Sequence, residues 1–409
     1  MQYFFLLGNN YELAAIEVYT VLQSFKIRYT TLLEQAPLLL IETETGIDLQ
    51  EIQNILGGTI KTGKILETVL GDSNEKLAKL LQETLGNYHE YLHFGINVFS
   101  KNYKQAREMA NNWKTWALAW KKRNKENYKR LRFVESNEDT LSSVIIQKNK
   151  LISENGCDFN LIYTEDRVFI GQSQTVQNFE LYSQLDYGRP AYDAKVGMIP
   201  PKLAQTLINL SRLANENIKD LQLLDPFCGS GTILSQAIYS GFIHIQGTDL
   251  DPEAIERSVE NLAYVKEILN TSKIKEEIFQ ADVNKLSTMF TKANINKVIT
   301  ETHLGPALSG KESKDELLRI KDELSKLYQS AISEIYKVLD SKGILVIVIP
   351  VFTYKQQLIK FDIQNMIYNN FKKAKQLGQH KELYTDRGSL LYKRPNQKLW
   401  REIFVFQKQ

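Results

Sequence analysis

The second half of the chain alternates strand-like and helix-like runs, and this alternation restricts the fold more than any other feature of the 409 residues. Short apolar runs such as LQLLDP, HIQGTDL and GILVIVIP are separated by amphipathic runs such as PEAIERSVENLAYVKEIL. Strands that alternate with helices form a parallel sheet covered by helices on both faces. The tail is different, because KQLGQHKELYT and REIFVFQK read as an antiparallel pair at the sheet edge. We therefore expect a mostly parallel α/β domain over residues 201–409.

The first half of the chain reads as two smaller α+β units. Residues 1–65 give a strand, a helix, two strands, a second helix and a further strand. Residues 66–177 continue with helices and strands and end in CDFNLIYTEDRVFIGQSQTVQ, which predicts a closing hairpin. Residues 178–200 have little periodicity and several glycines and prolines, so we expect a linker there.

The charge of the chain is unevenly distributed although its formal net value is only +3. Residues 101–132 contain 11 basic and 2 acidic side chains, and residues 351–409 contain 12 and 4. These two blocks have net charges of +9 and +8, so the rest of the chain is at −14. Such basic blocks favour an anionic partner at particular surfaces.

Targeting and covalent features point to a reducing compartment. The only cysteines, Cys157 and Cys228, are too few for a disulfide scaffold. The first residues lack the basic segment and long apolar run of a signal peptide. The longest later apolar stretch, at about residues 344–352, is far shorter than the roughly 20 residues that span a membrane. We expect a soluble, cytoplasmic protein without membrane contact.

A glycine turn follows the first strand of the predicted α/β domain. In LLDPFCGSGTILSQA the strand ends at Asp225, the turn contains Gly229 and Gly231, and a helix follows. The carboxyl ends of strands face the binding crevice of such sheets, and glycines let the backbone approach a ligand closely. The sequence matches neither the phosphate-binding pattern GxxxxGK[ST] nor the dinucleotide pattern GxGxxG. The remaining interpretation is a turn that binds S-adenosylmethionine, a cofactor without phosphates.

Acidic residues at the next two strand ends agree with this cofactor. Asp249 ends the second strand, where a carboxylate can accept hydrogen bonds from both ribose hydroxyls. Asp282 ends the third strand, where its side chain can accept a hydrogen bond from the adenine amino group. A single Asp at such a place is more often a turn or helix-cap residue. Three carboxylates in register with one glycine turn favour S-adenosylmethionine over another nucleotide or a vestigial fold.

These motifs resemble a known family. DPFCGSGT and GTDLDPEAIERSVENL resemble class I methyltransferases that modify exocyclic amino groups of bases. YFFLLGNNYELAAIE, LGGTIKTGKIL and RFVESNEDTLSSV are similar to the THUMP-containing tRNA guanine-N2 methyltransferases of the guanosine-10 type, as are DYGRPAYDAKVGMIPPKLAQTLINL and RGSLLYKRPNQKLWREIFVF. The resemblance covers nearly the whole chain. It implies a ferredoxin-like domain at 1–65, a THUMP-like RNA-binding domain at 66–177 and a Rossmann-like methyltransferase domain at 201–409.

The resemblance also implies the residues that hold the cofactor and the RNA. For S-adenosylmethionine these are Asp225, Phe227, Gly229, Gly231, Thr232, Asp249, Leu250, Asp282 and Val283. For tRNA they are basic residues in KKRNKENYKR, namely Lys121, Lys122, Arg123, Lys125, Lys129 and Arg130. The alternative for this basic run is a solvated helix end, stabilised by the helix dipole. No motif identifies a helper subunit or the target nucleotide.

The catalytic signature of this family is altered in the chain. The family has [DN]PP[YF] after the fourth strand, and this sequence has VITETHLGPALSG. We expect Glu301 to take the acidic role and His303 the stacking role against an extruded base. The alternatives are an RNA-binding protein that has lost methyl transfer, and a DNA amino-methyltransferase, which leaves the first 175 residues unexplained.

The remaining histidines and tryptophans read as structural. His89 and His93 have metal-like spacing only in a helix, so we expect no metal site. Trp113, Trp116 and Trp120 follow helical spacing, which predicts a core stripe rather than a stacking surface.

Overall fold

The computed structural model describes residues 1–71, 73–136, 140–191, 198–290, 295–367, 370–374, 380–394, 397 and 399–409. The chain divides into two compact units. The amino-terminal unit contains residues 1–9, 27–54 and 59–179, and the carboxy-terminal unit contains residues 10–26, 55–58 and 180–409.

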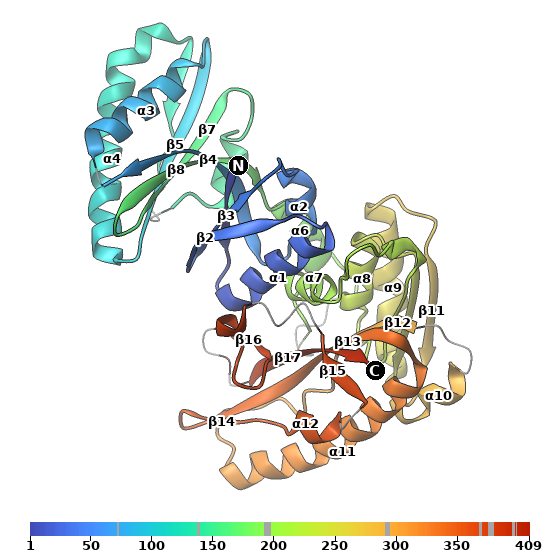
Figure 1. The fold of residues 1–409 in the computed structure, drawn as a ribbon. Helices are drawn as coiled ribbons and strands as arrows, with labels where there is room; N and C mark the ends of the chain where they lie inside the picture. Colours follow the sequence, from blue (N-terminus) through green and yellow to red (C-terminus); the bar gives the residue numbers. More distant parts are fainter. Residues whose placement is uncertain are drawn as a thin grey trace. The chain divides into compact units, whose positions relative to one another are not determined.

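The amino-terminal unit is built on one eight-stranded sheet with the order β2-β3-β1-β4-β8-β7-β5-β6 (Figure 1). The first four strands, with α1 and α2 between them in the sequence, follow the βαββαβ order of a ferredoxin-like domain. Neighbouring strands are antiparallel, except that β5 is parallel to both β6 and β7. The elements of this region are β1 (Gln2–Leu7), β2 (Tyr29–Gln35), β3 (Leu38–Thr43), α2 (Leu49–Ile55), β4 (Thr59–Leu70), α3 (Asn74–Gly86), β5 (Tyr91–Ser100), α4 (Tyr103–Asn124), η1 (Lys125–Asn127), β6 (Arg130–Phe133), α5 (Ser143–Lys148), β7 (Gly156–Tyr163) and β8 (Arg167–Val176).

Strand β4 joins the two α+β units that the sequence suggests. It pairs with β1 on one side and with β8 on the other. The expected boundary between residues 65 and 66 therefore falls inside this strand. Pairing on both sides leaves β4 with no exposed edge, and this explains why the sheet continues across the boundary.

Helices α3 and α4 cover one face of this sheet. Their apolar side chains form a buried cluster with residues of β5, β7 and β8. Trp113 and Trp120 are buried in this cluster and Trp116 packs against it, so the predicted core stripe is confirmed. The indole Nε1 of Trp113 donates to the hydroxyl of Tyr163 at 2.8 Å, which satisfies its polar group inside the core.

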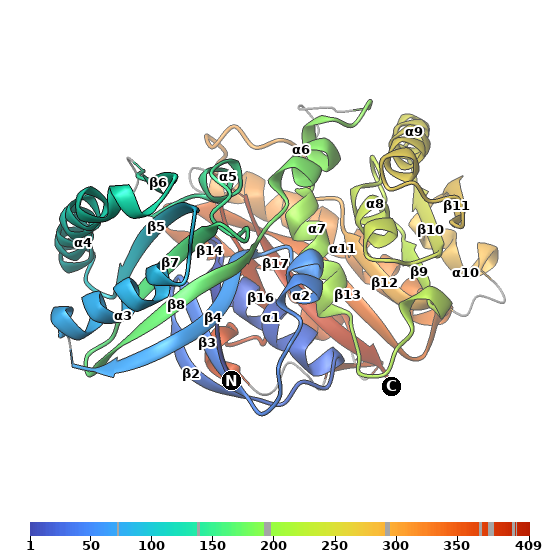
Figure 2. The same cartoon turned by 90° about the horizontal axis from the view of Figure 1, so that it is seen from above.

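The carboxy-terminal unit contains a sheet with the order β11-β10-β9-β12-β13-β17-β15, with β14 on β13 and β16 on β17 (Figure 2). Strands β9 to β13 are parallel, and β17 is antiparallel to β13. The expected α/β fold with an antiparallel carboxy-terminal edge is therefore confirmed. The elements are α1 (Tyr11–Ser24), α6 (Phe179–Tyr187), α7 (Pro201–Leu210), η2 (Ile218–Asp220), β9 (Gln222–Asp225), α8 (Thr232–Tyr239), β10 (His244–Asp249), α9 (Pro252–Ile268), β11 (Lys275–Gln280), η3 (Val283–Lys285), α10 (Leu286–Met289), β12 (Ile295–Glu301), α11 (Lys314–Val338), β13 (Leu339–Tyr354), β14 (Gln357–Ile359), α12 (Ile363–Met366), β15 (Phe371–Lys373), η5 (Lys381–Leu383), β16 (Leu390–Tyr392) and β17 (Leu399–Lys408).

Helices lie on both faces of this sheet, with α7, α8 and α9 on one face and α10, α11 and α12 on the other (Figure 1). The apolar side chains of α11 pack on β12, β13 and β17 in a buried cluster. A capping box between Ser313 and Glu316 fixes the start of this helix. The sheet is thus held rigidly between two helical layers, which positions the ends of its strands.

Two segments differ from the sequence-based expectation. The expected linker at 178–200 contains helix α6, and its residues 192–197 lie outside the described part. The expected tail strand KQLGQHKELYT was wrong where the structure describes it, because residues 381–383 form a short 3-10 helix and β17 pairs instead with β13, β15 and β16. Among the described residues, no helix is long and apolar enough to span a membrane.

Candidate active site

Strands β10 and β11 lie on one side of β9, whereas β12 and β13 lie on its other side, so the strand order reverses between β9 and β12. Open α/β sheets bind their ligands at such a switch point. Asp225 ends β9, and Thr300 and Glu301 end β12. The hydroxyl of Thr300 donates a 2.6 Å hydrogen bond to Oδ1 of Asp225 across the switch point. The structure therefore brings the end of the glycine-turn strand and the end of β12, where Glu301 lies, together.

The glycine turn has a backbone that only glycine adopts easily. Gly229 has φ of +53° and Gly231 has φ of +77°, both in the left-handed region. A Cβ atom on Gly231 would lie 2.5 Å from Oγ of Ser258, so close packing on α9 also requires glycine there. A Cβ on Gly229 would meet no atom within 4 Å. The bare backbone at Gly229 therefore faces open space, which suits close approach of a ligand.

Asp249 is bonded directly to this turn. Its Oδ2 accepts the backbone N–H of Gly229 at 2.9 Å, and its Oδ1 accepts the N–H of Asp251 at 3.1 Å. A carboxylate oxygen has two lone pairs, so each oxygen keeps one acceptor position for a ribose hydroxyl. The next residue, Leu250, is 68% exposed, so an apolar side chain is accessible one position after the carboxylate. This arrangement fits a ligand with a diol and a flat apolar ring.

Asp225 is buried and titrates unusually. The pKa of its carboxyl is raised to about 7, mainly by burial. The hydrogen bonds from Thr300 and the Phe227 N–H lower this pKa, and the charges of Asp249 and Glu301 raise it. Near neutral pH the group is therefore partly protonated. Asp225 orders the turn through these two hydrogen bonds, at 2.6 Å and 3.2 Å.

Asp282 and Val283 have a structural role in addition to any ligand contact. Oδ1 of Asp282 accepts the backbone N–H of Asn284 at 2.9 Å and caps the 3-10 helix η3. Val283 is buried in the core cluster beneath the sheet. Phe227 packs partly against the same cluster. The contacts of these three residues with the cofactor stay predictions.

An arginine that the sequence analysis missed supports the glycine turn. Nη1 of Arg189 donates to Oγ1 of Thr232, the first residue of α8, at 2.6 Å. The arginine is 3% exposed and also lies 3.6 Å from Asp186. Asn261 on α9 adds a 2.9 Å hydrogen bond to the carbonyl of Ser230. No periodic pattern marks Arg189 in the sequence, so only tertiary structure reveals this support.

Glu301 forms an ion pair with Arg401 of the neighbouring β17 segment. Nε of Arg401 donates to Oε1 of Glu301 at 2.6 Å, and Nη2 lies 3.4 Å from Oε2. The two side chains are only 10% and 7% exposed. Burial alone would lower the pKa of Arg401, but the attraction of Glu301 outweighs it and the pKa is raised. Arg401 therefore stays charged and fixes the direction of the carboxylate.

The sequence does carry a signal for Arg401, because Arg401 and Glu402 interrupt the apolar run of β17 and buried charges require partners. Glu402 is paired with Arg387 at 2.8 Å. His303, expected to stack on a base, has an exposed side chain, and its carbonyl accepts the hydroxyl of Tyr328 at 2.5 Å. Its stacking role stays a prediction.

The basic run of the amino-terminal unit surrounds the end of α4. Lys121, Lys122 and Arg123 occupy the last turn of α4, where positive charge complements the helix dipole. Lys129 pairs with Glu90 at 2.6 Å, and both side chains are largely exposed. The described residues Lys125 and Arg130 are also exposed. RNA binding by this group stays a prediction.

Comparisons with known proteins agree with the fold of the carboxy-terminal unit. Residues 217–408 match the family model described as a methyltransferase domain. TrmN from Thermus thermophilus is similar over 100% of both chains, with 13% identity and a TM-score of 0.56. A possible methylase from Clostridium difficile 630 covers 100% of this chain and 99% of its own, with 15% identity and a TM-score of 0.53. No curated protein sequence matches significantly.

A third solved structure is described as a predicted N6-adenine-specific DNA methylase from Listeria monocytogenes. It shares 13% identity over 98% of this chain and 95% of its own, with a TM-score of 0.50. At such low identities these likenesses establish the fold alone. Strand order, glycine turn and family match together define a class I methyltransferase domain. Residues 217–408 are therefore an S-adenosylmethionine-dependent methyltransferase domain.

Proposed function

We propose that the protein methylates an exocyclic amino group of a base in RNA, with a guanine of tRNA as the leading substrate. The observation that carries this proposal is the oriented carboxylate of Glu301 at the switch point, next to Asp225 and the glycine turn. Support also comes from the sequence motifs, which resemble tRNA guanine-N2 methyltransferases over nearly the whole chain.

The residues present fit the cofactor. The open space at Gly229 admits a ligand against bare backbone, and Asp249 beside it has acceptor positions for a ribose. When bound, S-adenosylmethionine supplies a methyl group that its sulfonium has already activated. Gly229, Gly231 and Asp249 would hold it, and Arg189 would keep the turn in place through Thr232.

Glu301 would orient the amino group that is methylated. The lone pair of a guanine amino group is delocalised into the ring, so the group is a weak nucleophile and needs alignment. Oε1 of Glu301 is engaged by Arg401 at 2.6 Å, whereas the contact at Oε2 is long, at 3.4 Å. Oε2 therefore keeps acceptor capacity for an amino N–H. The new N–C bond would form as the S–CH3 bond of the sulfonium breaks and the thioether leaves, and the N–H proton would pass to the carboxylate or to water.

The test is transfer of label from methyl-labelled S-adenosylmethionine to total tRNA. We expect wild-type protein to label tRNA and Glu301→Gln to be slower by at least about a hundredfold, because proton acceptors contribute on this order. Glu323→Gln, at an exposed position of α11, is the matched control and should retain the wild-type rate. A Glu301→Gln enzyme with the wild-type rate would remove Glu301 from this role.

A second candidate is an RNA-binding protein without methyl transfer. The ion pair favours it, because Arg401 already occupies part of the acceptor capacity of Glu301. Binding of tRNA without label in any RNA would support this candidate. Duplex DNA that competes better than tRNA would instead favour DNA amino-methylation, the activity named for the Listeria structure.

A further inference from the structure

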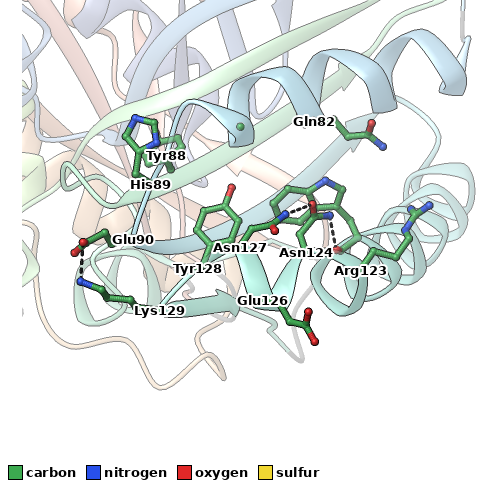
Figure 3. A pocket seen from close by; sticks show the side chains of 12 residues that line it. Gln82, Tyr88, His89, Glu90, Arg123, Asn124, Glu126, Asn127, Tyr128 and Lys129 are labelled. Carbon is green, nitrogen blue, oxygen red and sulfur yellow. Dashed lines mark hydrogen bonds and ion pairs between the residues drawn. The ribbon is translucent and has the colours of Figure 1, made fainter.

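A hollow of about 1000 Å³ lies in the amino-terminal unit, at the carboxyl ends of α3 and α4 (Figure 3). Its lining combines aromatic rings, side-chain amides, two basic residues, Arg123 and Lys129, and two acidic residues, Glu90 and Glu126. The residues that matter to its chemistry are Gln82, Trp120, Arg123, Asn124, Asn127 and Tyr128. It is separate from the switch point of the methyltransferase domain, and nothing in the cofactor chemistry uses it.

Tyr128 is the central ring of the hollow (Figure 3). Its hydroxyl donates to the carbonyl of Leu85 at 3.0 Å, so the ring is held in one orientation. The indole of Trp120, buried beneath, lies 6.2 Å from it between ring centroids. A ring fixed by packing and by a hydrogen bond stacks on a planar ligand with little loss of entropy.

Amide groups stand beside the rings in set positions. Nδ2 of Asn124 donates to the carbonyl of Trp120 at 2.9 Å, and Oδ1 of Asn124 lies 3.3 Å from Nδ2 of Asn127. An amide has two N–H donors and a carbonyl acceptor, so both asparagines keep polar positions for a ligand. Gln82 presents a third amide from α3 and is exposed. Such groups recognise the polar edge of a heterocycle.

The electrostatics separate the ligand into a neutral part and an anionic part. Helices α3 and α4 both end here, at Gly86 and Asn124, and helix carboxyl ends have a partial negative charge. A phosphate inside the hollow is therefore disfavoured. At the rim Arg123 is exposed and forms no ion pair with the described residues, whereas Lys129 is engaged with Glu90. Arg123 is thus the group available to an anion.

We propose that this hollow binds one unpaired base of an RNA strand. The base stacks on Tyr128 with its edge against Asn127 and Gln82, and its phosphate contacts Arg123. Aromatic stacking with a nearby cation is how proteins hold single-stranded nucleic acid. This inference rests on the proposed function, because it takes RNA as the partner.

Gly86 allows the hollow to be narrowed without disturbing the fold. It lines the hollow, a Cβ built on it meets no atom within 4 Å, and its φ is not positive. Leu and Ala are both better helix residues than Gly, so neither substitution strains α3. Gly86→Leu extends a branched apolar side chain into the hollow and narrows it, and Gly86→Ala is the matched control that adds only a methyl group.

The experiment measures binding by the full chain to a short labelled single-stranded RNA, the same RNA as a duplex, and single-stranded DNA of the same sequence. We expect single-stranded RNA to bind best. Gly86→Leu and Tyr128→Leu should each weaken it about tenfold, the effect of one stacked base. Arg123→Ala should also weaken it, whereas Gly86→Ala and Arg107→Ala, on the same helix about 24 Å away, should stay within about twofold. Melting curves check that each variant is folded.

Equal binding by Gly86→Leu and Gly86→Ala, or equal binding of single strand and duplex, would overturn the inference. Tighter binding to DNA would overturn its assignment to RNA. If these fail while tRNA is still methylated in a Glu301-dependent way, the proposed function stands and the hollow has no part in it. If wild-type protein neither binds nor methylates RNA, both proposals fail.

Discussion

The ion pair between Glu301 and Arg401 gives the sharpest test of the site. It joins the ends of β12 and β17, 100 positions apart in the chain. Arg401→Met removes the guanidinium and keeps an unbranched side chain of similar length. The Glu301 carboxylate would then remain in a place where only 10% of its side chain is exposed. The substitution thus leaves a buried charge without its partner.

The expected loss follows from the burial of both partners. Removal of one partner of a buried ion pair costs about 3–5 kcal/mol of unfolding free energy. Because the side chains here are 7% and 10% exposed, we expect the lower end, about 3 kcal/mol, for Arg401→Met. Glu301→Gln leaves the guanidinium of Arg401 without a charged partner and should lower the unfolding free energy by a similar amount. The double variant should cost about 2 kcal/mol less than the sum, because neither charge is then left alone.

The assay is urea unfolding of the full chain. A chain with two compact units unfolds in up to two transitions, so the relevant one must be identified. Saturating S-adenosylmethionine stabilises only the domain that binds it, by about 2.7 kcal/mol at a hundred times the Kd, and this shift marks the transition to read. Arg319→Met, at an exposed position of α11, is the control and should change stability by less than about 0.5 kcal/mol.

A coupling energy below about 0.5 kcal/mol would refute the reasoning. The pair would then behave like an exposed surface ion pair, which contributes little. The carboxylate of Glu301 would not be fixed by Arg401, and the proposed orientation of the amino group would lose its physical basis.

Three further predictions concern the cofactor turn. Gly231→Ala, with its Cβ 2.5 Å from Ser258 Oγ at φ of +77°, should lose about 2–3 kcal/mol of unfolding free energy in urea. Gly229→Ala should lose only about 1 kcal/mol of unfolding free energy, but calorimetry should show S-adenosylmethionine binding at least about tenfold weaker. Equal affinity of Gly229→Ala and wild type would show that the turn does not approach the cofactor. Because the folded-state pKa of Asp225 is about 7 against an ordinary 3.8, its protonation favours folding fully below about pH 4, and this advantage is lost as pH rises through 7. The unfolding free energy of Asp225→Asn, relative to that of wild type, should therefore rise by up to roughly 4 kcal/mol between pH 4 and pH 8. A difference in unfolding free energy that does not depend on pH would contradict the raised pKa of Asp225. Asp249→Ala should raise the Kd for S-adenosylmethionine about tenfold or more, since the ribose and the Gly229 N–H lose their acceptor; an unchanged Kd would exclude this role.

Much of the fold could be predicted because its signals are local. The period of the apolar residues identified the strands and helices of the methyltransferase domain, and DPFCGSGT identified the turn after β9. The stripe of Trp113, Trp116 and Trp120 was assigned to the core by spacing alone. The continuation of β4 across residues 65 and 66 was not predictable in this way, because strand pairing depends on partners far away in sequence.

The site was predictable in type but not in its contacts. Three acidic strand ends implied a ligand with a ribose, and Asp249 does lie against Gly229. The pairing of Glu301 with Arg401, and that of Thr232 with Arg189, could not be read from the sequence. The identity of an arginine in the sequence does not tell whether it is buried against a carboxylate or exposed to water.

The sequence by itself determined the alternation of strands and helices in the methyltransferase domain, the glycine turn at Gly229 and Gly231, and the acidic residues at the strand ends, since each depends on the chemistry of near neighbours. Tertiary structure alone decided that Glu301 is held by an arginine from another strand, and that the ends of α3 and α4 enclose a hollow. Packing brings together groups that no spacing in the chain connects, and it sets their exposure and hence their charge interactions.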